Sequence, residues 1–201
     1  MNEPLSKEEV DRLMQIKGNV RGAVFQTHAA YIRQKHGEKG LEAVEKRLRE
    51  LGYPIKFNEV DPLNWYSEAH TILVILVAKE LFNWDDSDVF DMGNTAPKYS
   101  FIVKLLMKYF LSPRKTFEMT PKYWEKHYDF GKLEIGQFNE KEKYMSVRIK
   151  GYKTHPIVCI FHRGYFLRIC QYVIKSKDIT MEETKCVFRG DPYHEYVARW
   201  K

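Results

Sequence analysis

The chain has 201 residues, of which 44% are hydrophobic and 14% aromatic, as is typical of one globular domain with a substantial core. Its 33 basic and 27 acidic residues give a net charge of +6, but both signs interleave along the same segments, which does not favour nucleic-acid binding. With three cysteines, no apparent secretion leader and no apolar run longer than residues 72–78, we expect a cytoplasmic protein without a membrane span.

The first half of the sequence is predicted to be helical, with glycine and proline separating the helices. Ser6 followed by Glu9 is a capping-box pattern, which predicts a helix start. The long apolar stretch after Pro62 predicts a buried central helix. The predicted helices cover residues 6–16, 20–35, 40–51, 61–81, 85–92, 99–111 and, for one or two turns, 120–127.

The pattern changes from helices to strands at Gly131. Two segments with alternating apolar and polar side chains predict a hairpin, and a second hairpin is predicted at the end of the chain around a turn at Gly190. Between them, Pro156 begins a predicted helix. The predicted strands cover residues 132–138, 143–151 and two runs after residue 179, and the helix covers 156–175.

These elements predict an α+β fold, in which a helical N-terminal layer packs on a four-stranded antiparallel sheet with one inserted helix. We expect residues 1–201 to form a single ligand-binding domain. Its helical part is residues 1–130 and its sheet-containing part is residues 131–201.

The last predicted hairpin brings a thiol close to an imidazole. Cys186 and His194 lie four residues either side of Gly190, so a hairpin places their Cβ atoms about 5 Å apart. Cys159 lies near the start of the helix predicted before this hairpin, and a helix N-terminus favours the thiolate form. Thiolate and imidazole are zinc ligands, so the three residues are a candidate zinc site.

A fourth zinc ligand is less well defined. Glu182 shares a strand face with Cys186 by period-two alternation, and Glu140 and Glu142 on the neighbouring hairpin turn are further candidates. The alternative is that the cysteines pack as small hydrophobic side chains and that His194 is hydrogen-bonded on a strand.

The C-terminal segment resembles the 4-vinyl reductase domain, a small-molecule-sensing module related to haem-nitric-oxide-binding domains and to trafficking subunits of the TRAPP type. In metal-binding members of that family the site is built of three cysteines and a glutamate. The resemblance implies that Cys159 and Cys186 match two of these cysteines and that His194 replaces the third. The residues that carry it are Cys159, Gly164, Tyr165, Cys186, Gly190, Asp191, Pro192, Tyr193 and His194.

The N-terminal half is similar to haem-nitric-oxide-binding domains in its helix order and glycine positions. Tyr144, Ser146 and Arg148 match the Tyr-x-Ser-x-Arg pattern with which those domains hold haem propionates, and alternation places all three on one strand face. The resemblance therefore implies a possible haem. No histidine lies in residues 92–126, where the axial ligand is expected. An ordinary half-exposed strand is the alternative interpretation.

We expect a stand-alone sensor or carrier domain with an apolar pocket between the helical layer and the sheet, and with a structural zinc site. The alternatives are a haem-binding gas sensor and a tetrapyrrole vinyl reductase-like enzyme, although no dinucleotide-binding loop supports an enzyme. The expected partners are a small hydrophobic or aromatic ligand and either a second copy of the chain or a signalling protein. The expected ligand-binding residues are Tyr66, His70, Phe101, Tyr144, Ser146 and Arg148.

Overall fold

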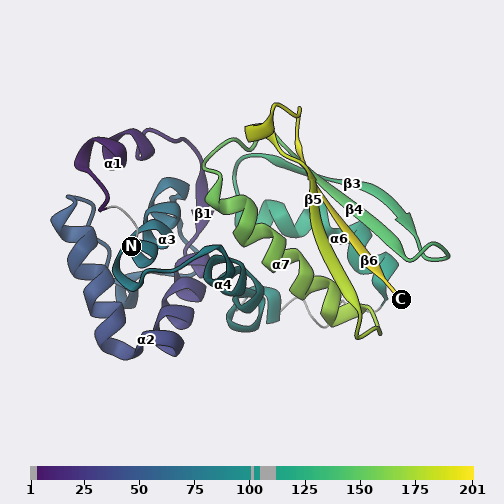
Figure 1. Cartoon of the computed structure of the whole chain (residues 1–201), viewed down its shortest axis with the longest axis horizontal. Helices are drawn as coiled ribbons and strands as arrows, with labels where there is room; N and C mark the ends of the chain where they lie inside the picture. The colour runs from purple at the N-terminus through teal and green to yellow at the C-terminus, as the bar shows by residue number, and fades with distance from the viewer. Residues whose placement is uncertain (1–3, 101, 105–111) are drawn as a thin grey trace.

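Helices form most of the chain before the sheet, as the sequence predicts (Figure 1). The computed structural model describes residues 4–100, 102–104 and 112–201. No described helix is both long enough and apolar enough to cross a membrane. The helices are α1 (Lys7–Leu13), α2 (Ala23–Glu50), α3 (Glu68–Phe82), α4 (Asp86–Tyr99), α6 (Pro113–His127) and α7 (Ile157–Val173), with short 3-10 turns η1 (Phe57–Glu59) and η2 (Val187–Arg189).

Several helix predictions differ from the structure in their bounds. The helix predicted over 85–92 continues past Gly93 to Tyr99 as α4. The helices predicted over 20–35 and 40–51 join as α2, which bends at Gly37, where φ is +69°. The central helix begins at Glu68 because the residues before it form a small ladder, in which β1 (Asn19–Arg21) pairs with β2 (Trp65–Ser67). The helix predicted from residue 120 begins earlier, at a cap that Ser112 provides to the Lys115 N–H. The helix predicted over 99–111 lies largely outside the described residues.

The four-stranded sheet is antiparallel throughout and confirms the α+β prediction. Its spatial order is β3-β4-β6-β5, so the last strand in sequence lies inside the sheet. Helices α6 and α7 cover one face (Figure 1), and α7 is the helix inserted between β4 and β5. The strands are β3 (Lys132–Asn139), β4 (Tyr144–Lys150), β5 (Ile179–Lys185) and β6 (His194–Trp200).

Two glycines bring α4 and α7 into close backbone contact. A Cβ atom on Gly93 would lie 2.0 Å from the Phe161 carbonyl oxygen, and one on Gly164 would lie 2.1 Å from the Phe90 carbonyl oxygen. Asn94 on α4 stabilises this contact, because its side-chain amide donates a hydrogen bond to the Gly164 carbonyl on α7 at 3.1 Å. This contact sets the position of α7, the helix that carries Cys159 and part of the cavity wall.

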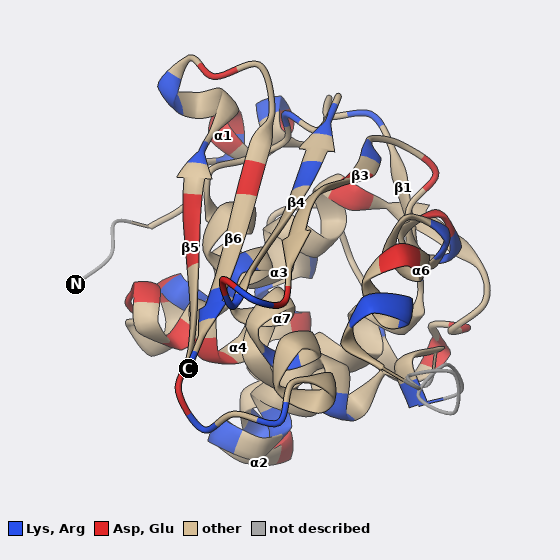
Figure 2. Ribbon diagram, turned by 90° about the vertical axis from the view of Figure 1, so that its right-hand side faces the viewer, with Lys and Arg blue, Asp and Glu red and all other residues tan. Residues whose placement is uncertain are grey.

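Acidic and basic residues are interspersed along the ribbon in Figure 2. The outer face of the sheet shows this mixing at short range. Arg148 on β4 pairs with Glu195 on β6 at 2.7 Å, and Glu195 also accepts a hydrogen bond from the Thr184 hydroxyl. These opposite charges compensate each other on the surface of the sheet.

Candidate functional site

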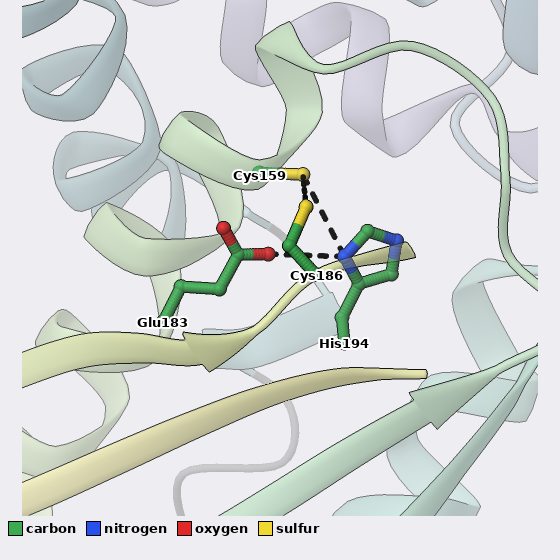
Figure 3. Close-up of side chains that lie close together, drawn as sticks. All are labelled: Cys159, Glu183, Cys186 and His194. Carbon is green, nitrogen blue, oxygen red and sulfur yellow. Dashed lines mark hydrogen bonds and ion pairs between the residues drawn. The ribbon is translucent and has the colours of Figure 1, made fainter. Parts of the chain in front are cut away.

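Four potential metal ligands converge where α7 meets the last hairpin (Figure 3). Cys159 comes from the first turn of α7, Glu183 from β5, Cys186 from the residue before η2, and His194 from the start of β6. One ligand atom from each residue lies within 4.8 Å of the other three. Among the described residues, this is the group of His, Cys, Asp and Glu side chains that can hold a metal ion.

The acidic member of this group is Glu183, whereas alternation predicted Glu182. The strand pairing explains the difference: Glu183 pairs with Tyr196, but Lys185 already pairs with Glu195, so Thr184 is an extra residue on β5. A bulge of this kind interrupts the period-two alternation. Glu183 therefore shares the inner face with Cys186, and Glu182 is exposed. Glu140 and Glu142 are also exposed and do not belong to the group.

The spacing of the ligand atoms fits a small tetrahedral cation. The Sγ atoms of Cys159 and Cys186 are 3.8 Å apart, and Cys159 Sγ lies 3.7 Å from His194 Nδ1. A zinc ion bound to two thiolates at about 2.3 Å in tetrahedral geometry holds the sulfur atoms about 3.8 Å apart. Glu183 Oε1 lies 3.0 Å from His194 Nδ1 and supplies the fourth ligand atom of the tetrahedron.

The imidazole of His194 is oriented from outside the group. Its Nε2 donates a hydrogen bond to the Tyr152 carbonyl at 2.8 Å. A carbonyl only accepts, so Nε2 carries a proton. Without a cation Nδ1 can also be protonated and donate to Glu183 Oε1, whereas with a cation bound Nδ1 would present its lone pair to the centre of the group. The backbone N–H of Cys186 donates to Asp191 at 2.8 Å and fixes the turn that carries this thiol.

Burial and neighbouring groups shift the pKa values of Cys159 and Glu183 in opposite directions. Burial, followed by the nearby Glu183 carboxylate, raises the pKa of the Cys159 thiol well above its ordinary value. The effect of burial on the Cys159 pKa therefore outweighs the effect of the helix N-terminus, which the sequence predicts to favour the thiolate. Burial also acts to raise the pKa of Glu183, but hydrogen bonding and charge from His194 lower it overall. A bound cation would reverse the effect on Cys159, because it stabilises thiolate directly.

A cavity of about 70 Å³ lies between α2, α4, α6, β3 and α7. Its described lining contains no Lys, Arg, Asp or Glu. Most of its polar groups lie on α6 and the residue after it and on one turn of α7, and Thr27 on α2 and Ser100 after α4 supply the others. The described lining residues are Ala23, Val24, Thr27, Ala96, Ser100, Val103, Thr120, Tyr123, Trp124, His127, Tyr128, Leu133, Phe161, His162, Tyr165, Phe166 and Ile169.

The last residue of α6, His127, is the least satisfied polar side chain of this lining. Its Nδ1 lies 2.9 Å from the Tyr123 carbonyl, and its buried Nε2 has no hydrogen-bond partner. Burial lowers the pKa of His127. The sequence placed Trp124 and His127 in a short helical turn, but gave no sign that this turn continues a helix bordering a cavity.

The side chains of Tyr144, Ser146 and Arg148 do not line the cavity. Val147 and Ile149 of the same strand are buried in the core, so alternation directs Ser146 and Arg148 to the outer face. The hydroxyl of Ser146 accepts from the Gln137 N–H at 3.0 Å, and Arg148 pairs with Glu195.

The remaining expected ligand-binding residues also lie away from the cavity or outside the described residues. The hydroxyl of Tyr66 accepts from the Asp61 N–H at 3.0 Å, and its ring packs on Phe25. His70 packs edge-on against Tyr53. Neither lines the cavity. Phe101 lies outside the described residues.

No protein-family model matches the chain, and no curated protein matches it. Solved structures do. An H-NOX protein from S. oneidensis in the Fe(II)NO ligation state is similar with a TM-score of 0.66 and 12% identity over 90% of this chain and 99% of that one. An unliganded Fe(II) H-NOX mutant from K. algicida has a TM-score of 0.62 and 11% identity over 90% and 96%. An oxygen-binding H-NOX domain related to soluble guanylate cyclases has a TM-score of 0.60 and 12% identity over 90% and 95%.

The chain therefore has an α+β fold in which a helical layer covers one face of an antiparallel sheet. It is the fold of the haem-nitric-oxide-binding, or H-NOX, domains, and the resemblance inferred from helix order is confirmed at this level. The closer resemblance to the 4-vinyl reductase domain stays a prediction. At 11–12% identity, this similarity establishes the fold only. The ligand and cofactor must be inferred from the side chains of this chain.

Proposed function

We propose that this chain is a small-molecule-binding sensor or carrier domain whose ligand occupies the cavity between α2, α4, α6, β3 and α7. The observation that carries the proposal is the lining: it is apolar and uncharged over the described residues, yet it contains one buried imidazole nitrogen without a partner. Specific ligand sites combine these two properties, because apolar surface supplies affinity and a few polar atoms fix orientation.

A structural zinc ion at Cys159, Glu183, Cys186 and His194 is the second part of the proposal. Its support is the tetrahedral spacing of the ligand atoms and the burial of both thiols and the imidazole. Four protein ligands leave no open position for substrate, which is typical of a structural rather than a catalytic zinc site. The ion would tie the last hairpin to α7, and α7 also supplies Phe161 and His162 to the cavity wall.

Haem is the second candidate occupant, and two observations favour it. Similar solved structures are described in an Fe(II)NO state and as an oxygen complex. His127 Nε2 is also free to act as an axial ligand, since its other nitrogen is held by the Tyr123 carbonyl.

The rest of the cavity does not fit haem. Propionates need cationic partners, but the described lining has none, and Arg148 is paired with Glu195 on the other face of the sheet. The volume of about 70 Å³ is also far below the roughly 300 Å³ at the lower end of sites for drug-sized ligands. We therefore rank haem second.

Metal analysis and an absorption spectrum of the purified full chain, before and after incubation with haem, test the two candidates together. We expect about one zinc per chain and no Soret band. A Soret band that is retained in His70→Leu and lost in His127→Leu would instead establish haem as the occupant. The His70→Leu variant is the matched control, because His70 also has a buried nitrogen without a partner but lies outside the cavity.

A further inference from the structure

The protonation of His127 is fixed by its own helix. Nδ1 lies 2.9 Å from the Tyr123 carbonyl, one turn earlier on α6. Because a carbonyl oxygen can only accept, Nδ1 is the nitrogen that carries the proton, and Nε2 of the neutral ring is a hydrogen-bond acceptor. Burial lowers the pKa of His127, which keeps the ring neutral at pH 7.

The Nε2 atom of His127 is a polar atom of the described lining that a ligand can engage. It is buried and has no partner, and the ring edge that carries it is turned away from the α6 backbone. Three other polar side chains of the described lining are already engaged with the backbone. The Thr27 hydroxyl donates to the Val24 carbonyl at 2.7 Å, the Thr120 hydroxyl to the Thr116 carbonyl at 3.0 Å, and the Trp124 Nε1 to the Gly131 carbonyl at 3.2 Å.

The charge and the volume of the cavity further restrict the class of ligand that it can bind. The described lining offers no charged partner, so an ionised ligand would be buried without compensation. The volume of about 70 Å³ is roughly half that of the engineered 150 Å³ cavity that holds benzene. We therefore expect the cavity, as far as the described residues bound it, to accept a ligand no larger than a compact planar ring.

We propose that the cavity selects neutral, compact aromatic molecules that carry an N–H or O–H donor, and that Nε2 of His127 accepts this donor. The inference rests on the proposed function, because it names the ligand class of the same cavity. A water molecule can satisfy Nε2 when no ligand is present, so an aromatic ring without a donor loses that hydrogen bond when it displaces the water. A ring with a donor replaces it.

Pyrrole and furan are matched probes, because both are five-membered aromatic rings and only pyrrole carries a donor. Both are titrated into the full zinc-loaded chain and followed by protein NMR shifts. We expect pyrrole to bind about tenfold more tightly than furan, as one buried hydrogen bond corresponds to about that ratio. The ¹⁵N resonance of His127 Nε2 should shift with pyrrole and not with furan.

The preference should disappear in His127→Leu, which retains apolar volume and loses the acceptor, and should persist in the control His70→Leu. Equal affinities in the wild-type chain, or a preference that survives in His127→Leu, would overturn the inference and leave the ligand-binding cavity standing. Failure of both probes to bind the wild-type chain would overturn the proposed function as well. If His127→Leu does not fold, as judged by circular dichroism, the inference is tested by the wild-type chain alone. A His127 Nε2 resonance that does not shift with pyrrole, or that shifts equally with furan, would then overturn it.

Discussion

Glu68 is a carboxyl group buried at the first turn of α3, with only 2% of its surface exposed. It accepts hydrogen bonds from the Tyr152 hydroxyl and from the Thr71 hydroxyl. Burial raises the pKa of Glu68 to about 7, although the bonds from Tyr152 and Thr71 act in the opposite direction. The same Tyr152 offers its carbonyl to His194, so one residue connects the helical layer with the metal-binding group.

We predict that Glu68→Gln changes how stability depends on pH. The folded-state pKa lies above the unfolded value of 4.5, so the neutral carboxyl stabilises the fold fully below pH 4.5. This contribution is lost as the pH rises through about 7, because the unfolded chain ionises first. Relative to the variant, the wild-type chain should lose up to about 3 kcal/mol between these limits.

Urea unfolding of both proteins at several pH values measures this difference, and contributions from the buried histidines cancel in the comparison. A difference that does not vary between pH 4.5 and 7 would show that Glu68 is ionised in the folded chain at neutral pH or that it titrates normally.

At the scale of elements, the metal-binding group connects the last hairpin to the start of α7, and an apolar cluster of Cys170, Ile174 and Ala198 connects it to the end of α7. Cys159 and His194 come from different elements and are 35 residues apart. An ion held by both would link these elements directly, and its binding free energy would contribute to folding.

We predict that Cys186→Ser abolishes zinc binding and lowers the melting temperature by roughly 5–15 °C, because the bound ion no longer stabilises the folded state. Cys170→Ser is the matched control: Cys170 is also a buried free thiol but belongs to a different cluster, with Ile174 and Ala198. Its metal content should equal that of the wild-type chain. Elemental analysis and calorimetry provide the measurements, and full zinc occupancy in Cys186→Ser would exclude this site.

The sequence predicts the type and order of the helices and strands better than the local irregularities within them. The α+β order and the proximity of Cys186 to His194 follow from hydrophobic periodicity and from the turn at Gly190. The identity of Glu183 depends on the bulge at Thr184, which no local residue preference requires. The outward direction of Arg148 depends on which face of β4 the helices cover, and this is decided by tertiary packing.

At the scale of the whole molecule, the metal-binding group and the cavity lie along one helix. Cys159 is in the first turn of α7, and the cavity contacts of α7 extend from Phe161 to Ile169. Loosening the start of this helix would therefore affect the cavity wall before it affects α3, which is packed within the helical layer.

We predict that removing zinc with a chelator increases hydrogen exchange in β5, in the segment through η2 and in the first turns of α7, while α3 keeps its protection. Hydrogen exchange followed by mass spectrometry gives this comparison segment by segment. Lower pH should have the same effect, because protonated thiols and imidazole release the ion. A uniform increase in exchange throughout the chain would show that the ion stabilises the whole fold rather than only the last hairpin and the start of α7.

The internal position of β6 determines when this half of the protein can be completed during synthesis. The strands β3 and β4 can form a hairpin as soon as they leave the ribosome, but β5 has no neighbour until β6 arrives. His194 arrives with the same strand, so a cation has no complete binding site before then. Until that moment an unpaired strand edge is exposed, which makes the nascent chain most prone to aggregation just before its last strand emerges.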